Sequence, residues 1–389
     1  MPSAKPAAQE SVKARWDDLV SLSERIHATP ELGFEEEKAS TWVSELLDAN
    51  GFRVEHGVYG MPTALVARAG SGPLHIALCA EYDSLPGMGH ACGHNLISAM
   101  SVGAAIAAAR LADDLGITVT VFGTPAEEVG DSGGKIQMLE QDAFAGMHAA
   151  MMVHPAPFDA VQPRIIASSM FEVEYTGKPA HAAAFPEEGI NALDAMTIAQ
   201  TAIGLIRQHI CPTDHVHGIC THGGDAPNII PARTRARYMI RSDKLEELQR
   251  LRDKVHRCFH AGAVGTGCKV EFIGGTKPYA DMVHDLQLGS LYERNAMELG
   301  RDFTHALPMM KKFAASTDMG NVSQVLPSIH PLISIDSLPA TNHQPEFAAH
   351  CVTPSAQKAL YDGAIAMAWT IVDMATNADV RNRLLQAQK

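Results

Sequence analysis

The hydrophobic pattern of the first 160 residues predicts strands that alternate with helices. Short apolar runs at Leu74–Ala80, Ile117–Gly123 and Ala149–His154 are typical of buried strands. The Ala- and Gly-rich run Leu96–Ala112 lies between the first two strands and predicts a buried helix, and residues 134–144 predict another before the third. Strands joined by helical crossovers form parallel sheets. We therefore expect a mostly parallel α/β sheet here.

The pattern changes after Pro163. Residues 164–177 alternate apolar and polar positions, as a half-exposed antiparallel strand does. Two long amphipathic helices at 190–210 and 244–263 follow, and further strand-like runs accompany them. We predict an α+β domain at 164–276, inserted into a catalytic α/β domain made of 1–163 and 277–389.

Length and charge narrow the class of protein. A chain of 389 residues is long for a single hydrophobic core, which agrees with two domains. The net charge of −13 disfavours nucleic acid and anionic membranes as partners. The first residues lack the apolar core of a signal peptide, and the seven cysteines are scattered and odd in number. We expect a cytoplasmic protein.

Most polar clusters of the first half follow directly after a predicted strand. The five side chains that matter most there can all bind metal: Cys92, His94, Glu127, Glu128 and His154. Because sites in parallel sheets form beyond the carboxyl ends of the strands, these side chains should lie together along that edge of the sheet. Thiolate, imidazole and carboxylate together suit zinc, or manganese and cobalt with a poorer match.

The adjacent carboxylates Glu127 and Glu128 point to a metal for a second reason. Two ionised carboxylates side by side in a low-dielectric pocket are costly. A cation bound by one of them offsets that cost and leaves the other free to act as a base.

Several motifs of this chain resemble one enzyme family. The sequences "EYDSLPG" and "HACGHN", then "GTPAEE", "MMVHP", "YTGKPAHAA", "GGDAPNIIP" and "TNHQPEF", are similar to the aminoacylase/carboxypeptidase family of di-metal peptidases. Within that family the chain resembles hydrolases of aminobenzoyl-glutamate, indole-acetyl-amino acids and β-alanyl-lysine. The resemblance covers nearly the whole chain. It implies a zinc-peptidase-like catalytic domain with an inserted dimerisation domain, and a homodimer or higher oligomer.

The resemblance also implies residue roles. Glu127 would be the general base, and Asp83 would orient a metal-bound group. In the inserted domain, His181 would reach across the dimer to polarise the scissile carbonyl, and Asn228 would help to hold the substrate or the oxyanion. The cofactor would be two divalent metal ions, zinc or manganese, with cobalt as a further candidate. The implied metal ligands are Cys92, His94, Glu128, His154 and His343.

Some assignments have rivals within the sequence. The stretch from Glu128 to His154 looks about two residues longer than in similar proteins, which makes His148 a rival ligand. The loop "GDSGG", residues 130–134, is similar to a serine-nucleophile motif, but it joins a parallel strand to a helix. We therefore expect Ser132 to be a bystander, and Cys92 to be a metal ligand rather than a nucleophile. Glu81, next to Tyr82 and Asp83, is expected to be a packing residue or a support for the ligands.

These observations predict a metal-dependent amidohydrolase that cleaves an amide bond in a small N-acyl amino acid or dipeptide. One alternative is hydrolytic deamination of a small aromatic amine on the same scaffold. A less favoured alternative is a metal-binding protein with no activity. The intact glutamate pair argues against the latter.

Overall fold

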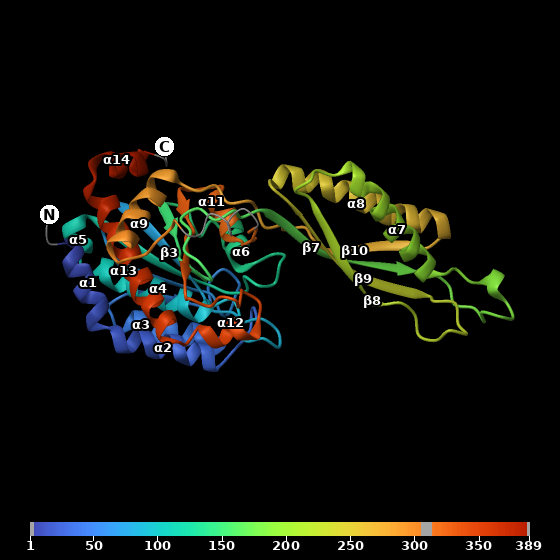
Figure 1. Cartoon of the computed structure of the whole chain (residues 1–389), viewed down its shortest axis with the longest axis horizontal. Helices are drawn as coiled ribbons and strands as arrows, with labels where there is room; N and C mark the ends of the chain where they lie inside the picture. Colours follow the sequence, from blue (N-terminus) through green and yellow to red (C-terminus); the bar gives the residue numbers. More distant parts are fainter. Residues whose placement is uncertain (1–3, 305–312, 387–389) are drawn as a thin grey trace. The chain divides into compact units, whose positions relative to one another are not determined.

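The computed structural model describes residues 4–304 and 313–386 and divides into two compact units (Figure 1). The larger unit contains the described residues up to Val129, then Gly133–Arg164, and those from Met282 onward. The smaller unit contains Gly130–Ser132 and Ile165–Asp281. Each unit has its own hydrophobic core.

The larger unit is built on a six-stranded sheet in the order β1-β2-β4-β3-β5-β11. Strands β4, β3, β5 and β11 run parallel, and β2 and β1 add an antiparallel edge. This mostly parallel sheet confirms the predicted fold class. Its strands are β1 (Arg53–His56), β2 (Leu65–Gly70), β3 (Leu74–Glu81), β4 (Ile117–Thr124), β5 (Ala149–Met151) and β11 (Ser328–Ile329).

The predicted buried helix is α4, which begins at His94 and ends at Ala109. Its small residues let other helices approach closely: a Cβ on Gly103 would lie 2.8 Å from Leu19 and 3.2 Å from Ala364. Helices α2 (Trp16–Ala28) and α13 (Pro354–Thr376) pack there. Among the described residues, no helix is long and apolar enough to cross a membrane.

The remaining helices of the larger unit surround this sheet and α4 (Figure 1). The N-terminal segment forms two helices, which are separated at Arg15. The helices are α1 (Ala4–Ala14), α2 (Trp16–Ala28), α3 (Glu37–Asp48), α5 (Ala112–Leu115), α6 (Gly134–Glu140), α9 (Leu286–Glu298), α11 (Met319–Ser323), α12 (Pro345–His350), α13 (Pro354–Thr376) and α14 (Ala378–Gln386).

The prediction of one strand over Ala149–His154 is wrong in part. Strand β5 ends at Met151, and a separate strand β6 (His154–Ala156) begins three residues later. Strand β6 pairs in parallel with β12 (Leu332–Ser334) in a two-stranded sheet. The apolar run continues across the break because Met152 and Val153 are fully buried, so hydrophobicity alone did not reveal it.

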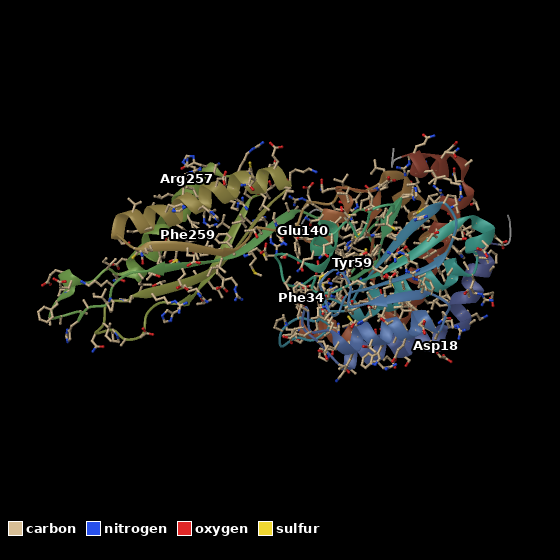
Figure 2. All side chains as sticks on the ribbon, turned by 180° about the vertical axis from the view of Figure 1, so that it is seen from behind. Asp18, Phe34, Tyr59, Glu140, Arg257 and Phe259 are labelled. Carbon is tan, nitrogen blue, oxygen red and sulfur yellow. The ribbon has the colours of Figure 1, made fainter. Side chains whose placement is uncertain are left out.

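The smaller unit is a four-stranded antiparallel sheet in the order β10-β7-β9-β8, covered by two helices. In α8, Leu248, Leu251, Val255 and Phe259 recur at helical spacing and face the sheet. Figure 2 shows Phe259 on the sheet side and Arg257 pointing outward. The elements are β7 (Ala167–Thr176), η1 (Pro186–Glu188), α7 (Ala192–Ile206), η2 (Arg207–His209), β8 (His215–His222), β9 (Arg233–Ser242), α8 (Leu245–Thr266) and β10 (Lys269–Gly274).

Candidate metal centre

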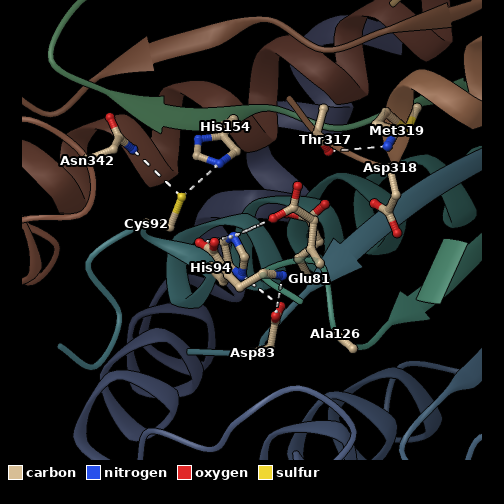
Figure 3. A network of polar contacts seen from close by, with 12 residues as sticks. Glu81, Asp83, Cys92, His94, Ala126, His154, Thr317, Asp318, Met319 and Asn342 are labelled. Carbon is tan, nitrogen blue, oxygen red and sulfur yellow. Dashed lines mark hydrogen bonds and ion pairs between the residues drawn. The ribbon is translucent and has the colours of Figure 1, made fainter. Parts of the chain in front are cut away.

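The predicted ligands of the larger unit lie together at the carboxyl ends of its parallel strands. Asp83 follows β3, His94 begins α4, and Glu127 and Glu128 follow β4. His154 begins β6, and His343 lies just before α12. Figure 3 shows Cys92, His94, His154 and Asp83 gathered in one place.

The turn Cys92–Gly93–His94 presents two of these side chains, and only glycine fits its centre. Gly93 has φ +82°, and a Cβ there would lie 2.9 Å from the side chain of Pro155. The left-handed turn lets the chain enter α4 immediately after Cys92. Both side chains are thereby held next to β6, the element that carries His154.

Cys92 lies close to two histidines of the site. Its Sγ lies 3.5 Å from Nε2 of His154 and 3.6 Å from Nε2 of His343. Oε1 of Glu128 lies 3.5 Å from the same nitrogen of His343. These four residues come from positions up to 251 apart in the sequence.

His154 is held in the tautomer that a metal ligand needs. Its Nδ1–H donates to the carbonyl of Pro155 at 2.8 Å, so the Nε2 lone pair faces Cys92. Burial lowers the pKa of His154 to about 4, which keeps the ring neutral at pH 7. Both features favour coordination of a cation.

His94 lies close to three carboxylates of the site, which are those of Asp83, Glu127 and Glu128. Its Nδ1 lies 2.9 Å from Oδ1 of Asp83, and neither side chain is exposed. The opposite nitrogen, Nε2, lies 3.8 Å from Glu128 and 4.0 Å from Glu127. Asp83 is therefore placed as a buried partner of His94, the arrangement that fixes the tautomer of metal-binding histidines.

The two glutamates lie in an environment of high negative charge. Burial, together with the charges of Glu81 and Glu128, raises the pKa of Glu127 well above its usual value. Burial also raises the pKa of Glu128, and the nearby His94 acts in the opposite direction. These surroundings favour the protonated form of Glu127, which suits a group that takes up a proton during a reaction.

Two residues of the site have left-handed backbone conformations that non-glycine residues rarely adopt. Ala126, just before the glutamate pair, has φ +57°, and His343 has φ +68°. Each is stabilised by a backbone hydrogen bond: Ala126 N–H donates to Oε1 of Glu36, and His343 N–H donates to the carbonyl of Ala91. Strain of this kind is concentrated at functional sites.

The chemistry of the donor atoms fits metal ions. Oε2 of Glu81, Nε2 of His94 and Oε1 of Glu128 are buried and have no hydrogen-bond partner among the described residues. Unpaired buried polar atoms are costly, and lone pairs that converge on one place are satisfied by a cation. Ligand atoms within 4.8 Å of one another are found in four groups: Cys92–His94–His154, Cys92–Glu128–His343, His94–Glu127–Glu128 and Glu81–Glu127–Asp318.

Beside the ligands lies a buried ion cluster that the sequence pattern does not reveal. Nζ of Lys135 lies 2.5 Å from Oε1 of Glu81 and 2.5 Å from Oδ1 of Asp318, and all three side chains are fully buried. Glu81 thus has a charged partner, which an ordinary packing residue would not need. Nothing in the local sequence marks Lys135 or Asp318, because the cluster joins residues 183 positions apart.

Glu36 is a second supporting residue that sequence reasoning missed. Its carboxylate accepts hydrogen bonds from Thr63 and from the backbone of Ala126, and burial raises its pKa to about 7. Glu36 lies in an acidic run, "FEEEK", in which no single glutamate stands out. Its role depends on the distant end of β4, so no local signal could have identified it.

His148 lies at the opposite end of β3 from the candidate centre, and Ser132 belongs to the smaller unit. Nδ1 of His148 accepts a hydrogen bond from the backbone of His75, at the amino end of β3, opposite the end that carries Asp83. Ser132 belongs to the smaller unit, where its N–H donates to the carbonyl of Lys277. Neither residue is in a potential metal-binding group of the described residues.

His181 and Asn228 lie side by side in the smaller unit. The N–H of Ala182 donates to the carbonyl of Asn228, and His181 forms a β-bridge with Ile229. Nδ1 of His181 accepts from the backbone N–H groups of Ala183 and Ala184. The ring proton of neutral His181 must therefore be on Nε2, which leaves an exposed hydrogen-bond donor.

The sequence is similar to known hydrolases over nearly its whole length. It is 37% identical over 388 residues to a human protein named Xaa-Arg dipeptidase, covering 95% of this chain and 88% of the relative. It is 32% identical over 283 residues to a p-aminobenzoyl-glutamate hydrolase polypeptide of Escherichia coli (strain K12), covering 67% of this chain and 58% of the relative. A family model described as a peptidase dimerisation domain matches residues 167–266.

Solved structures share the fold. An aminobenzoyl-glutamate utilization protein from Klebsiella pneumoniae has a TM-score of 0.73 at 16% identity, covering 92% of this chain and 97% of the other. A Bacillus subtilis protein described as a dinuclear metal binding peptidase from the M20 family has a TM-score of 0.70 at 21% identity, covering 93% and 99%.

Fold, donor set and relatives together define a metal-dependent hydrolase with an inserted domain. The chain belongs to the M20 family of peptidases, which confirms the predicted family and enzyme class.

Proposed function

We propose that this protein hydrolyses the amide bond of a dipeptide or N-acyl amino acid at a centre that holds two divalent cations. The observation that supports the proposal most is the convergence of a thiol, three imidazoles and several carboxylates. Nε2 of His94 and Oε1 of Glu128 in this set are buried and have no hydrogen-bond partner among the described residues. The cations would be held by Cys92, His94, Glu128, His154 and His343. Zinc and manganese suit this donor set, and cobalt is a further candidate.

Bound cations would polarise the scissile carbonyl and lower the pKa of a water molecule towards about 7. Glu127 would accept the proton of that water as it attacks, and would then donate it to the leaving amine. The environment of Glu127 supports this role, because burial and the charges of Glu81 and Glu128 raise its pKa and so make the carboxylate a stronger base. Asp83 would hold the His94 ring in place through its hydrogen bond to Nδ1.

His181 and Asn228 would bind the oxygen that becomes negatively charged during attack. The Nε2–H of His181 is the right kind of group, a neutral donor held by two backbone contacts to Nδ1. We propose that this histidine serves the site of a second copy of the chain in a homodimer. The match of residues 167–266 to a dimerisation domain supports that assembly.

For the substrate, we propose dipeptides with a basic carboxy-terminal residue as the first candidates. The relatives named Xaa-Arg dipeptidase are similar over 95% of this chain, which supports this choice. N-acyl amino acids, including aminobenzoyl-glutamate, are the second class. We also propose a cytoplasmic location, supported by seven free cysteines.

The test is a substrate screen with protein reconstituted with zinc, manganese or cobalt. Amino-acid release from dipeptides or acyl amino acids is the expected result, whereas ammonia release from aromatic amines would favour deamination. Glu127→Gln should keep its metal and lose activity by about 10²–10⁴-fold. Glu45→Gln, on the exposed side of α3, is the matched control and should keep full activity. A metal-loaded protein with no turnover on the whole panel would contradict the proposed function.

A further inference from the structure

Glu81 is the last residue of β3 and is fully buried beside the candidate centre. Its two carboxylate oxygens have different environments. Oε1 lies 2.5 Å from Nζ of Lys135, whereas Oε2 has no hydrogen-bond partner among the described residues. An unpaired anionic oxygen with no solvent access is costly, so this atom requires an explanation.

Oε2 of Glu81 faces another unpaired atom. It lies 3.5 Å from Nε2 of His94, which is also buried and lacks a hydrogen-bond partner among the described residues. Asp83 engages the opposite ring nitrogen, so Nε2 of the neutral ring carries a lone pair. Two lone pairs that face each other repel unless a cation lies between them.

The separation of these atoms suits a shared cation. Zn–N bonds of about 2.0–2.1 Å and Zn–O bonds of about 2.0–2.2 Å place tetrahedral ligand atoms about 3.3–3.5 Å apart. Glu81 meets that spacing and approaches Nε2 of His94 more closely than Glu128 at 3.8 Å or Glu127 at 4.0 Å.

The number of donors supports the same conclusion. At the Cys92 end, the thiol has His154 and His343 beside it, and Glu128 adjoins His343. At the His94 end, the ligand atoms of Cys92 and His154 lie within 4.8 Å of that of His94. With Glu81 added, the cation at that end would have four protein ligands, the number typical of a closed zinc site.

We propose that Glu81 is a further metal ligand, binding the cation nearest His94 through Oε2, and that Lys135 is a positioning residue that holds Oε1. This inference rests on the proposed two-cation function. The rigid ammonium contact would prevent the carboxylate from rotating, so that one oxygen always faces the metal.

Asp318 provides a contrast within the same cluster. Lys135 contacts both of its oxygens, Oδ1 through Nζ at 2.5 Å and Oδ2 through its backbone N–H at 2.9 Å. Both Glu81 and Asp318 neutralise the same ammonium, but only Glu81 has an oxygen left over. Asp318 is therefore the matched control for the loss of one carboxylate from the cluster.

The competing explanation is a proton between Glu81 and His94. Burial disfavours protonation of His94, but the charge of Asp83 and its hydrogen bond outweigh burial and raise the pKa of His94. An imidazolium paired with Glu81 would then satisfy both atoms without metal. In that case Glu81 would contribute nothing to metal affinity.

The experiment compares zinc binding by wild-type protein, Glu81→Gln and Asp318→Asn, using competition with a chelator and elemental analysis. Glu81→Gln should weaken one of two zinc sites by at least about 10–100-fold, and Asp318→Asn should keep wild-type zinc affinity. Wild-type affinity at both sites in Glu81→Gln, or an equal loss in Asp318→Asn, would overturn the inference.

A crystal structure of the zinc-loaded wild-type protein tests the inference even if Glu81→Gln does not fold. Oε2 of Glu81 should lie about 2.0–2.2 Å from a zinc ion, and a zinc-loaded site in which this oxygen binds no metal would refute it. A wild-type protein that takes up no divalent cation would instead refute the proposed function.

Discussion

Asp83 joins His94 and Glu128 through one carboxylate: Oδ1 lies 2.9 Å from Nδ1 of His94, and Oδ2 accepts the backbone N–H of Glu128 at 2.9 Å. Two proposed ligands from different strand ends are thus fixed by a single buried side chain. Because both oxygens are engaged, Asp83 determines where the imidazole and the glutamate loop lie relative to each other.

We expect Asp83→Asn to weaken metal binding by about 10–100-fold, because the amide cannot reproduce both acceptor contacts or stabilise the ligand tautomer of His94. Chelator competition on the purified variant measures this change. The control is Asp285→Asn, which removes the charge that pairs with Arg383 but keeps an oxygen that can accept the N–H of Leu288 at the start of α9. Equal metal affinity in both variants would contradict the assigned role of Asp83.

Cys92→Ala should lower the metal content, because the thiol lies within 3.6 Å of two imidazole nitrogens and would be a ligand common to them. Elemental analysis gives the stoichiometry directly. Cys79→Ala, a buried cysteine of β3, should retain the wild-type metal content. Full metal content combined with loss of activity in Cys92→Ala would favour a nucleophilic thiol instead.

Lys135→Met should destabilise the larger unit by about 3–5 kcal/mol, since it leaves Glu81 and Asp318 buried without their cation. Urea denaturation measures the change in free energy of unfolding. Lys178→Met removes an exposed pair with Glu188 and should change stability by less than about 1 kcal/mol. A small effect in both variants would contradict the stabilising role assigned to Lys135.

The grouping of the proposed ligands at one edge of the sheet could be predicted because it depends on short sequence patterns. The predicted apolar runs end at Ala80 and Gly123, and polar side chains follow each run, so parallel pairing of the strands brings these side chains together. Cys92, His94 and the glutamate pair could therefore be grouped from strand order alone. His343 could not, because nothing between residues 154 and 343 indicates that the chain returns to Cys92. Only the resemblance of "TNHQPEF" to the family motif pointed to it.

The buried ion cluster of Glu81, Lys135 and Asp318 could not be predicted from the sequence for a different reason. Lys135 lies near the start of α6, where a lysine is usually solvent-exposed, and Asp318 lies in a short loop before α11. Their pairing depends on the packing of α6 against α11, and no spacing rule encodes such a contact. The break between β5 and β6 was missed similarly, since strand pairing determined it and hydrophobicity did not.

The smaller unit should lose stability in mild acid because of His256. Its ring stacks on Phe272 at 3.9 Å, and burial, with help from Arg252, lowers its pKa from 6.5 to about 4. The unfolded chain therefore binds a proton between about pH 6.5 and pH 4 that the folded unit resists, so stability falls as the pH falls through this window. His256→Phe keeps the stacking on Phe272 but has no ring to titrate. The free energy of unfolding of this variant should therefore fall less between pH 7 and pH 5 than that of the wild type. An unchanged slope would contradict this explanation.

Mixing two inactive variants tests whether His181 acts across a dimer. In a dimer of Glu127→Gln with His181→Ala, the protomer that carries His181→Ala retains Glu127, and its partner retains His181. If His181 serves the other protomer, one complete site forms in each mixed dimer, and random mixing should restore about a quarter of wild-type activity. The two parent variants, assayed separately under the same conditions, give the baseline. If His181 serves its own protomer, every site lacks one of the two groups, and the mixture should be no more active than its parents.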